Sequence, residues 1–212
     1  MTQSEAIDHA ARWLPRPCLA SLLEVLREQG YAPWGPRVEG DAVVLAPIGT
    51  VGDLPVGWID RQAPGRYTLE RGDSERIFDV VHGPQGLKRH VFAPREALLQ
   101  IERLDERGDF EAKTVVPDAP RLALLGVRAC DLAALRIQDR IFLEDRFPDA
   151  PYAARRAGLF LVGVSCTRSV STCFCVSQGT GPAVRGDCDL ALTELDAGFV
   201  ARALSPAGRT VL

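Results

Sequence analysis

The first clear pattern of apolar and polar residues lies just after Pro17. The stretch Cys18-Leu-Ala-Ser-Leu-Leu-Glu-Val-Leu-Arg-Glu-Gln places apolar side chains at helical spacing and ends before Gly30. Proline is favoured in the first turn of a helix, and glycine is favoured just past its end. The pattern therefore predicts a short amphipathic helix.

Between residues 31 and 90 the apolar runs become short, as at residues 42–45 and 77–81, and Gly, Pro and Asp separate them. This alternation predicts short antiparallel strands joined by turns. A second helix is expected from Ala93-Pro94-Arg95-Glu96 through Leu104, because proline again stands in the first turn, with a glutamate near the positive end. Residues 108–120 contain Gly-Asp and Pro-Asp and are expected to form a connector.

Two continuous apolar runs, at residues 122–127 and 159–164, are each followed within a few residues by a cysteine. Such runs are typical of strands buried on both faces of a sheet. Between them, Asp131 is placed to cap a helix. The apolar residues of that expected helix are Leu132, Leu135, Ile137, Ile141 and Phe142. A strand, helix, strand order makes the two strands parallel, so Cys130 and Cys166 are expected at one edge of the sheet, where open α/β sheets bind ligands.

Residues 189–195 and 199–204, joined through Asp196-Ala-Gly198, are typical of a hairpin. Together the patterns predict an α/β (α+β) protein. Its mixed sheet is expected to hold a βαβ unit in the C-terminal half and short antiparallel strands in the N-terminal half. We expect a single domain over residues 1–212, divided into an N-terminal α+β lobe (1–115) and a C-terminal α/β lobe (116–212).

Composition narrows the classes of function. The 212 residues carry 25 Lys and Arg against 28 Asp and Glu, a net charge of −3 without any block of like charge, which argues against nucleic-acid binding. The polar N-terminus is unlike a secretory signal, and no apolar run approaches the ~18 residues of a membrane span. A cytoplasmic protein is expected. That compartment is reducing, so the six cysteines are expected to include metal ligands or reactive thiols rather than disulfides.

Four of these cysteines form the candidate site. Cys173-Phe174-Cys175 is followed by Gly179-Thr-Gly181-Pro, and glycine lets a backbone turn tightly around a bulky group and point amide hydrogens at sulfur. With Cys130 and Cys166 brought in by the sheet, four thiols converge. That is the ligand number of a [4Fe–4S] or [2Fe–2S] cluster, and four soft thiolates also suit zinc. The spacing matches neither a zinc ribbon nor a bacterial ferredoxin, which leaves the choice open.

The remaining candidates receive plainer interpretations. Cys18 is expected in the core, and Cys188 in a loop rather than as a fifth ligand. The histidines His9, His82 and His90 share no metal spacing. Three arginines near the proposed site either tune the potential of a cluster, steer an acidic partner or are simply solvated, namely Arg128, Arg168 and Arg185. A cysteine hydrolase using Cys173 or Cys175 is the main enzymatic alternative, although no sequence signature provides its histidine base.

Five segments of the chain resemble one known family, and the stretch from Thr-Cys-Phe-Cys to Gly-Thr-Gly-Pro is the most specific of them. The segments are Gly126-Val-Arg-Ala-Cys130-Asp-Leu-Ala-Ala-Leu, Gly163-Val-Ser-Cys166, Thr172-Cys173-Phe-Cys175-Val-Ser-Gln-Gly-Thr-Gly-Pro182, Asp189-Leu-Ala-Leu-Thr-Glu-Leu195 and Gly83-Pro-Gln-Gly-Leu-Lys-Arg-His-Val-Phe-Ala-Pro-Arg-Glu96. They resemble the β subunit of cytoplasmic sulfhydrogenases (hydrogenase/sulfur reductases) and the A subunit of anaerobic sulfite reductase.

The resemblance implies an iron–sulfur electron-transfer subunit that performs no bond-making of its own. Its partners would be hydrogenase, sulfur reductase or sulfite reductase subunits and a flavin diaphorase subunit. The ligands Cys130, Cys166, Cys173 and Cys175 all fall within family motifs and would hold a [4Fe–4S] cluster, with zinc in a structural or assembly domain as the alternative. Members of the family typically continue into a dicluster ferredoxin domain, which we expect to be absent here. The position of Cys188 is usually tyrosine in the family.

Overall fold

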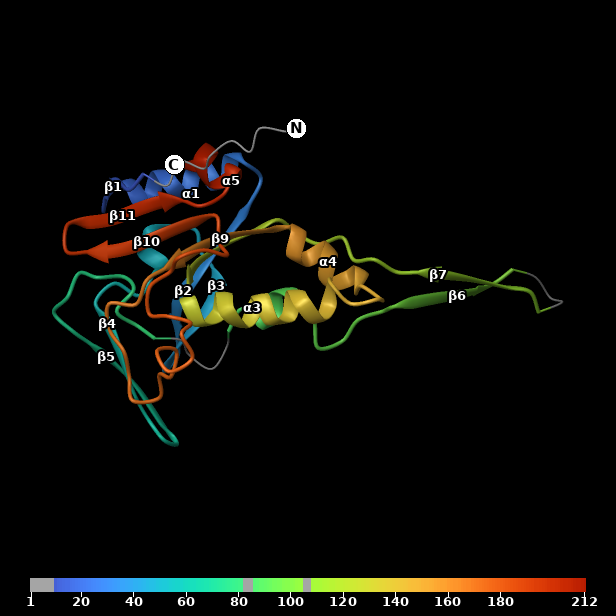
Figure 1. Ribbon diagram of the computed structural model, residues 1–212, viewed down its shortest axis with the longest axis horizontal. Helices are drawn as coiled ribbons and strands as arrows, with labels where there is room; N and C mark the ends of the chain where they lie inside the picture. Colours follow the sequence, from blue (N-terminus) through green and yellow to red (C-terminus); the bar gives the residue numbers. More distant parts are fainter. Residues whose placement is uncertain (1–9, 82–85, 105–107) are drawn as a thin grey trace.

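The computed structural model describes residues 10–81, 86–104 and 108–212. Their main feature is a seven-stranded sheet with helices on both faces (Figure 1), in the strand order β1-β11-β10-β9-β8-β2-β3. Two separate two-stranded ribbons complete the described strands. The predicted α/β class with a mixed sheet is therefore confirmed.

The large sheet consists of β1 (Arg12–Pro15), β2 (Ala32–Glu39), β3 (Ala42–Pro47), β8 (Leu122–Val127), β9 (Leu159–Val164), β10 (Leu190–Leu195) and β11 (Gly198–Ala203). The ribbons are β4 (Trp58–Ala63) with β5 (Arg66–Arg71), and β6 (Leu99–Arg103) with β7 (Phe110–Thr114). The helices are α1 (Cys18–Glu28), the short 3-10 helix η1 (Val51–Asp53), α2 (Lys88–Val91), α3 (Ala129–Phe142), α4 (Ala150–Ala157) and α5 (Pro206–Val211).

The centre of the sheet is parallel. β8 pairs in parallel with both β9 and β2, and β9 pairs in parallel with β10. All residues of β8 and β9 are buried, which explains their continuous apolar sequences. The predicted parallel pair is thus confirmed, with α3 and α4 in the connection. The strands β2 and β3 come from the N-terminal half, so the large sheet draws on both halves, and the division into two lobes stays a prediction.

Each face of the sheet has its own apolar core. On one face, leucines of α1 pack with alternate residues of the central strands, among them Leu125, Phe160 and Leu192. On the other, residues of α2, α3 and α4 pack on the intervening positions, such as Leu124 and Leu161. The ribbon in Figure 1 shows α1 and α5 on one side of the sheet, with α3 and α4 on the other. The rigid centre fixes where the carboxyl ends of β8 and β9 lie.

Several local predictions are confirmed. The first helix spans Cys18–Glu28, residues 42–45 lie within β3, and β10 pairs with β11 as an antiparallel hairpin. The cap of α3 is shifted: the helix begins at Ala129, and the Asp131 carboxylate accepts the backbone N–H of Arg128 at 3.0 Å. An acidic residue in the first turn also suits the positive end of the helix dipole.

Two predictions for the N-terminal half are wrong. Residues 77–81 form no strand: they are a largely buried loop whose N–H groups bind side-chain carboxylates, as Ile77 does to Glu194 at 2.8 Å. The helix expected from residue 93 is instead the strand β6, paired with β7, which itself replaces part of the expected connector. Figure 1 shows this β6–β7 arm projecting from the body.

The exposure of the β6–β7 arm explains why its sequence suggested a helix. All ten residues of β6 and β7 are exposed, so no packing against a core stabilises the helix that the spacing of the leucines suggested. Leu99 and Ile101 face the same side as Phe110, whereas Glu102 and Lys113 lie on the other and form an ion pair at 3.4 Å. The pairing of two alternating patterns therefore outweighs the helical signal.

His90 gives a pH-dependence prediction for the fold. Its ring packs edge-on against Trp34, with centroids 4.7 Å apart, and burial, together with the charge of Arg89, lowers its pKa to about 4. Because the unfolded chain binds this proton more tightly, stability is complete above the unfolded pKa of 6.5 and is lost as the pH falls toward 4. The ring is only partly buried, so we expect a loss of about 1 kcal/mol between about pH 7 and about pH 5.

Urea unfolding at both pH values measures this loss. His90→Gln removes the titrating group and should flatten the difference between the two pH values. An unchanged difference in the variant would assign it to other groups.

Candidate functional site

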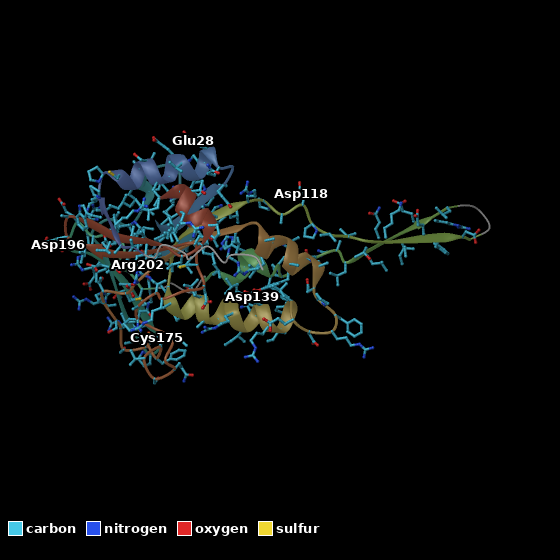
Figure 2. The ribbon with its side chains drawn as sticks, turned by 45° about the horizontal axis from the view of Figure 1, so that its top comes forward. Glu28, Asp118, Asp139, Cys175, Asp196 and Arg202 are labelled. Atoms are coloured by element: carbon cyan, nitrogen blue, oxygen red, sulfur yellow. The ribbon has the colours of Figure 1, made fainter. Side chains whose placement is uncertain are left out.

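The candidate site lies at the carboxyl edge of the parallel strands. Cys130 stands at the start of α3, three residues after β8 ends, and Cys166 stands two residues after β9 ends. Figure 2 shows Cys175 on a loop near the amino end of α3, on the side of the body away from the β6–β7 arm. Three sections of chain, each placed by a different element, therefore meet at this edge.

The thiols influence one another electrostatically. The pKa of Cys130 is raised to about 11, chiefly by burial and next by the charge of Asp131, with smaller contributions from Cys166 and Cys175, although part of the residue reaches solvent. The pKa of Cys166 is raised chiefly by burial, and the charges of Cys175 and Cys173 add to this. Contacts of the glycine-rich loop agree with this: a Cβ at Gly181 would lie 3.4 Å from the Cβ of Ala129, and the N–H of Cys166 donates to the carbonyl of Pro182 at 3.1 Å. The loop that follows Cys175 therefore lies against the chain segments that carry Cys130 and Cys166.

The loop that carries Cys173 and Cys175 turns back on itself. The N–H of Cys173 donates to the carbonyl of Val170 at 3.0 Å, and the N–H of Thr180 donates to the carbonyl of Cys175 at 2.9 Å. Gly179 has a φ of +65°, a left-handed conformation that favours glycine. A Cβ at Gly181 would lie 3.0 Å from the Cys175 sulfur, so glycine lets the backbone approach this thiol closely.

The same loop is anchored to the β4–β5 ribbon. The guanidinium of Arg168 donates to the Asp60 carboxylate at 2.8 Å, to the Asp60 carbonyl, and to the Asp79 carbonyl at 3.0 Å. Further along, the hydroxyls of Ser171 and Thr172 donate to the Gln62 carbonyl and side-chain oxygen at 2.9 and 3.0 Å. The cysteine loop is therefore held from outside, by residues far away in sequence.

Arg128 brings a buried cation to the site. It is 4% exposed, and its Nη2 donates to the carbonyls of Phe78 at 2.8 Å and Val80 at 2.6 Å. Its charge works against the upward shift of the Cys166 pKa. Its Nη1 is buried and has no hydrogen-bond partner among the described residues. An unpaired buried N–H of a cation is costly and points to an anionic group at this position.

These observations test whether the residues fit an iron–sulfur cluster. The donors are soft thiolates of the type that iron–sulfur clusters require, Gly181 leaves room beside Cys175, and Arg128 offers an unused donor. The residues fit the group in the chemistry of their donor atoms. Within the described ranges, no group of three or more His, Cys, Asp or Glu side chains is gathered tightly enough to hold a single metal ion.

The other sequence candidates are not part of this group of thiols. Cys188 is buried in the loop before β10, close enough to Gly163 that a Cβ there would lie 3.0 Å from its sulfur, and burial raises its pKa to about 12. Cys18 is half-buried at the start of α1, not fully in the core as expected. Arg185 is exposed. His9 and His82, with residues 83–85 of one family-like segment, lie outside the described residues.

Sequence analysis did not identify Asp60 and Arg128 as the residues whose buried contacts support the site. Asp60 was not a candidate, and the sequence left the role of Arg128 open. Their partners lie 108 and about 50 residues away, so no local spacing announces either contact. The available signal was weak: an arginine directly between a buried strand and a candidate ligand.

Fold and site together define a class of protein: an α/β chain with several thiols gathered at the carboxyl edge of its parallel strands. Over 121 residues, which are 57% of this chain, the sequence is 34% identical to sulfhydrogenase 2 subunit beta of Pyrococcus furiosus. The chain spans about a third of that subunit's length, 33%. No protein-family model and no solved structure matches the chain.

This similarity supports a relationship to hydrogenase β subunits, at modest identity. It agrees with the family resemblance of the cysteine segments and with a redox subunit of a hydrogenase-type complex. No helix among the described residues is long and apolar enough to cross a membrane.

Proposed function

We propose that this chain is an iron–sulfur electron-transfer subunit of a cytoplasmic hydrogenase, sulfur reductase or sulfite reductase complex. Cys130, Cys166, Cys173 and Cys175 are the ligands of one [4Fe–4S] cluster. The observation that carries the proposal is the position of Cys130 and Cys166 after two parallel strands, with the glycine-rich loop of Cys175 against the start of α3. The similarity to a sulfhydrogenase β subunit supports the same class of partner.

The residues have distinct roles in this proposal. The sheet fixes Cys130 and Cys166, and the Arg168–Asp60 contact holds the loop that brings Cys173 and Cys175. When bound, the cluster supplies one-electron transfer, and burial and nearby hydrogen-bond donors set its potential. Exposed Phe174 leaves an apolar surface beside the site, directly between the two loop ligands.

The hydrolase alternative gains no support from the described histidine. His90 packs against Trp34, and its Nε2 is buried without a hydrogen-bond partner among the described residues. Zinc remains the alternative metal that the same four thiols would bind.

Anaerobic reconstitution of the 212-residue chain with iron and sulfide tests the proposal. We expect stoichiometric iron and sulfide and a visible absorption that dithionite bleaches. The bleaching distinguishes the cluster from bound zinc, because zinc has no redox chemistry. Single replacements of the four ligands by alanine should each remove most of the bound iron.

Cys188→Ala is the matched control, since Cys188 is a buried cysteine on the same side of the sheet, and it should keep the iron. Retention of full iron by any of the four ligand variants would contradict the assignment of that cysteine as a ligand, and retention by all four would contradict the proposal. Binding of zinc with no redox-active colour would favour the structural alternative.

A further inference from the structure

We propose that Arg128 is the built-in counter-charge of the site and that it makes the bound cluster easier to reduce. This inference rests on the proposed function, because it concerns the reduction potential of the group held by the four cysteines. Arg128 is not a ligand in this view. It is a positioning and tuning residue that acts through charge.

The first support is the burial of the guanidinium. Arginine stays protonated at all ordinary pH values, so 4% exposure means that a full positive charge has been taken out of water. Among the described residues, no carboxylate forms an ion pair with it, since the neighbouring Asp131 carboxylate accepts the backbone N–H of Arg128 instead. Burying a cation without an anionic partner is costly.

The second support is the division of labour within the side chain. Nη2 is occupied by the carbonyls of Phe78 and Val80, which fixes the plane of the guanidinium. Nη1 is left buried and unpaired among the described residues. The carbonyl contacts therefore account for the position of the side chain but not for its charge or its second donor.

The third support is the direction in which the free charge acts. Arg128 stands between the end of β8 and the start of α3, two residues before Cys130, so its buried guanidinium belongs to the same edge of the sheet as the ligands. Four thiolates around an iron–sulfur core carry net negative charge, and reduction by one electron adds one more. A fixed positive charge nearby stabilises the reduced form more than the oxidised form, without any change in its own protonation.

The reduction potential of reconstituted variants tests this inference. Arg128→Gln should lower the midpoint potential by at least a tenfold change in the reduction equilibrium, which is about 59 mV for one electron. Arg128→Lys keeps the charge and should stay within that tenfold range. Arg185→Gln removes the same charge from an exposed position near the site, where solvent screens it, and should leave the potential unchanged.

The outcomes separate this inference from the proposed function. If the unaltered chain takes up no iron, the proposed function fails. If Arg128→Gln takes up the normal amount of iron and keeps the normal potential, Arg128 is merely structural and the inference is wrong. Should Arg128→Gln not fold, Arg128→Lys decides the question. A midpoint potential lowered by more than about 59 mV in Arg128→Lys, which retains the charge, would overturn the role of charge.

Discussion

Replacing Glu194 by alanine is expected to lower the free energy of unfolding by about 3–5 kcal/mol. Glu194 lies in β10 and is 1% exposed. Its carboxylate accepts the N–H groups of Ile77 and Phe78, both at 2.8 Å, and the guanidinium of Arg16 at 2.7 Å. Alanine would leave two buried N–H groups without an acceptor, and each such group is costly.

Urea unfolding measures the total loss, and amide hydrogen exchange locates it. Exchange should rise first at residues 77–80, which have no strand partner to replace the lost bonds. Asp196→Ala is the matched control: this carboxylate pairs with Arg76 at 2.8 Å but is 92% exposed, so its removal should cost less than about 1 kcal/mol. A Glu194→Ala protein as stable as the control would mean that the 77–80 loop is held by its apolar side chains alone.

The parts of the fold that could be predicted from sequence are those whose environment is uniform. β8 and β9 are buried on both faces, so six consecutive apolar residues announce each of them. The helix predicted for residues 93–104 was wrong because the strand β6 in this segment is fully exposed and packs on no core. A run with leucines at both helical and alternating positions fits either a helix or a strand. Its pairing with β7 decided the outcome, and pairing is not a local property.

The candidate site divides in the same way. Cys130 and Cys166 could be proposed from sequence because each follows a buried strand, and Cys173 and Cys175 could be proposed because a glycine-rich stretch follows them. Their supports could not, because Arg128 is bound by carbonyls of a loop that the sequence pattern had assigned to a strand. Buried polar contacts between distant segments depend on the finished fold, and single-sequence patterns carry little trace of them.

Replacing Asp60 by alanine is the second change with a large expected effect, again about 3–5 kcal/mol, and its damage should centre on the cysteine loop. Asp60 is fully buried, and its carboxylate accepts the N–H of Val81 at 2.6 Å, the amide of Gln62 at 2.8 Å and the guanidinium of Arg168 at 2.8 Å. Without it, Arg168 keeps only carbonyl acceptors, and the section between Cys166 and Cys173 loses its ionic anchor.

This second loss should differ from that of Glu194→Ala in location. In Asp60→Ala we expect faster amide exchange at residues 167–173 and weaker retention of reconstituted iron. Asp60→Asn keeps the shape and part of the acceptor set, so its exchange and its iron content should lie between those of the unaltered protein and Asp60→Ala. Glu70→Ala is the control on the same ribbon, since the Glu70–Arg61 pair is exposed to solvent and should contribute little to stability. If Asp60→Ala lost stability but kept both normal exchange in the loop and normal iron, the loop would be held by the thiols and their cluster, and the anchor would serve the fold alone.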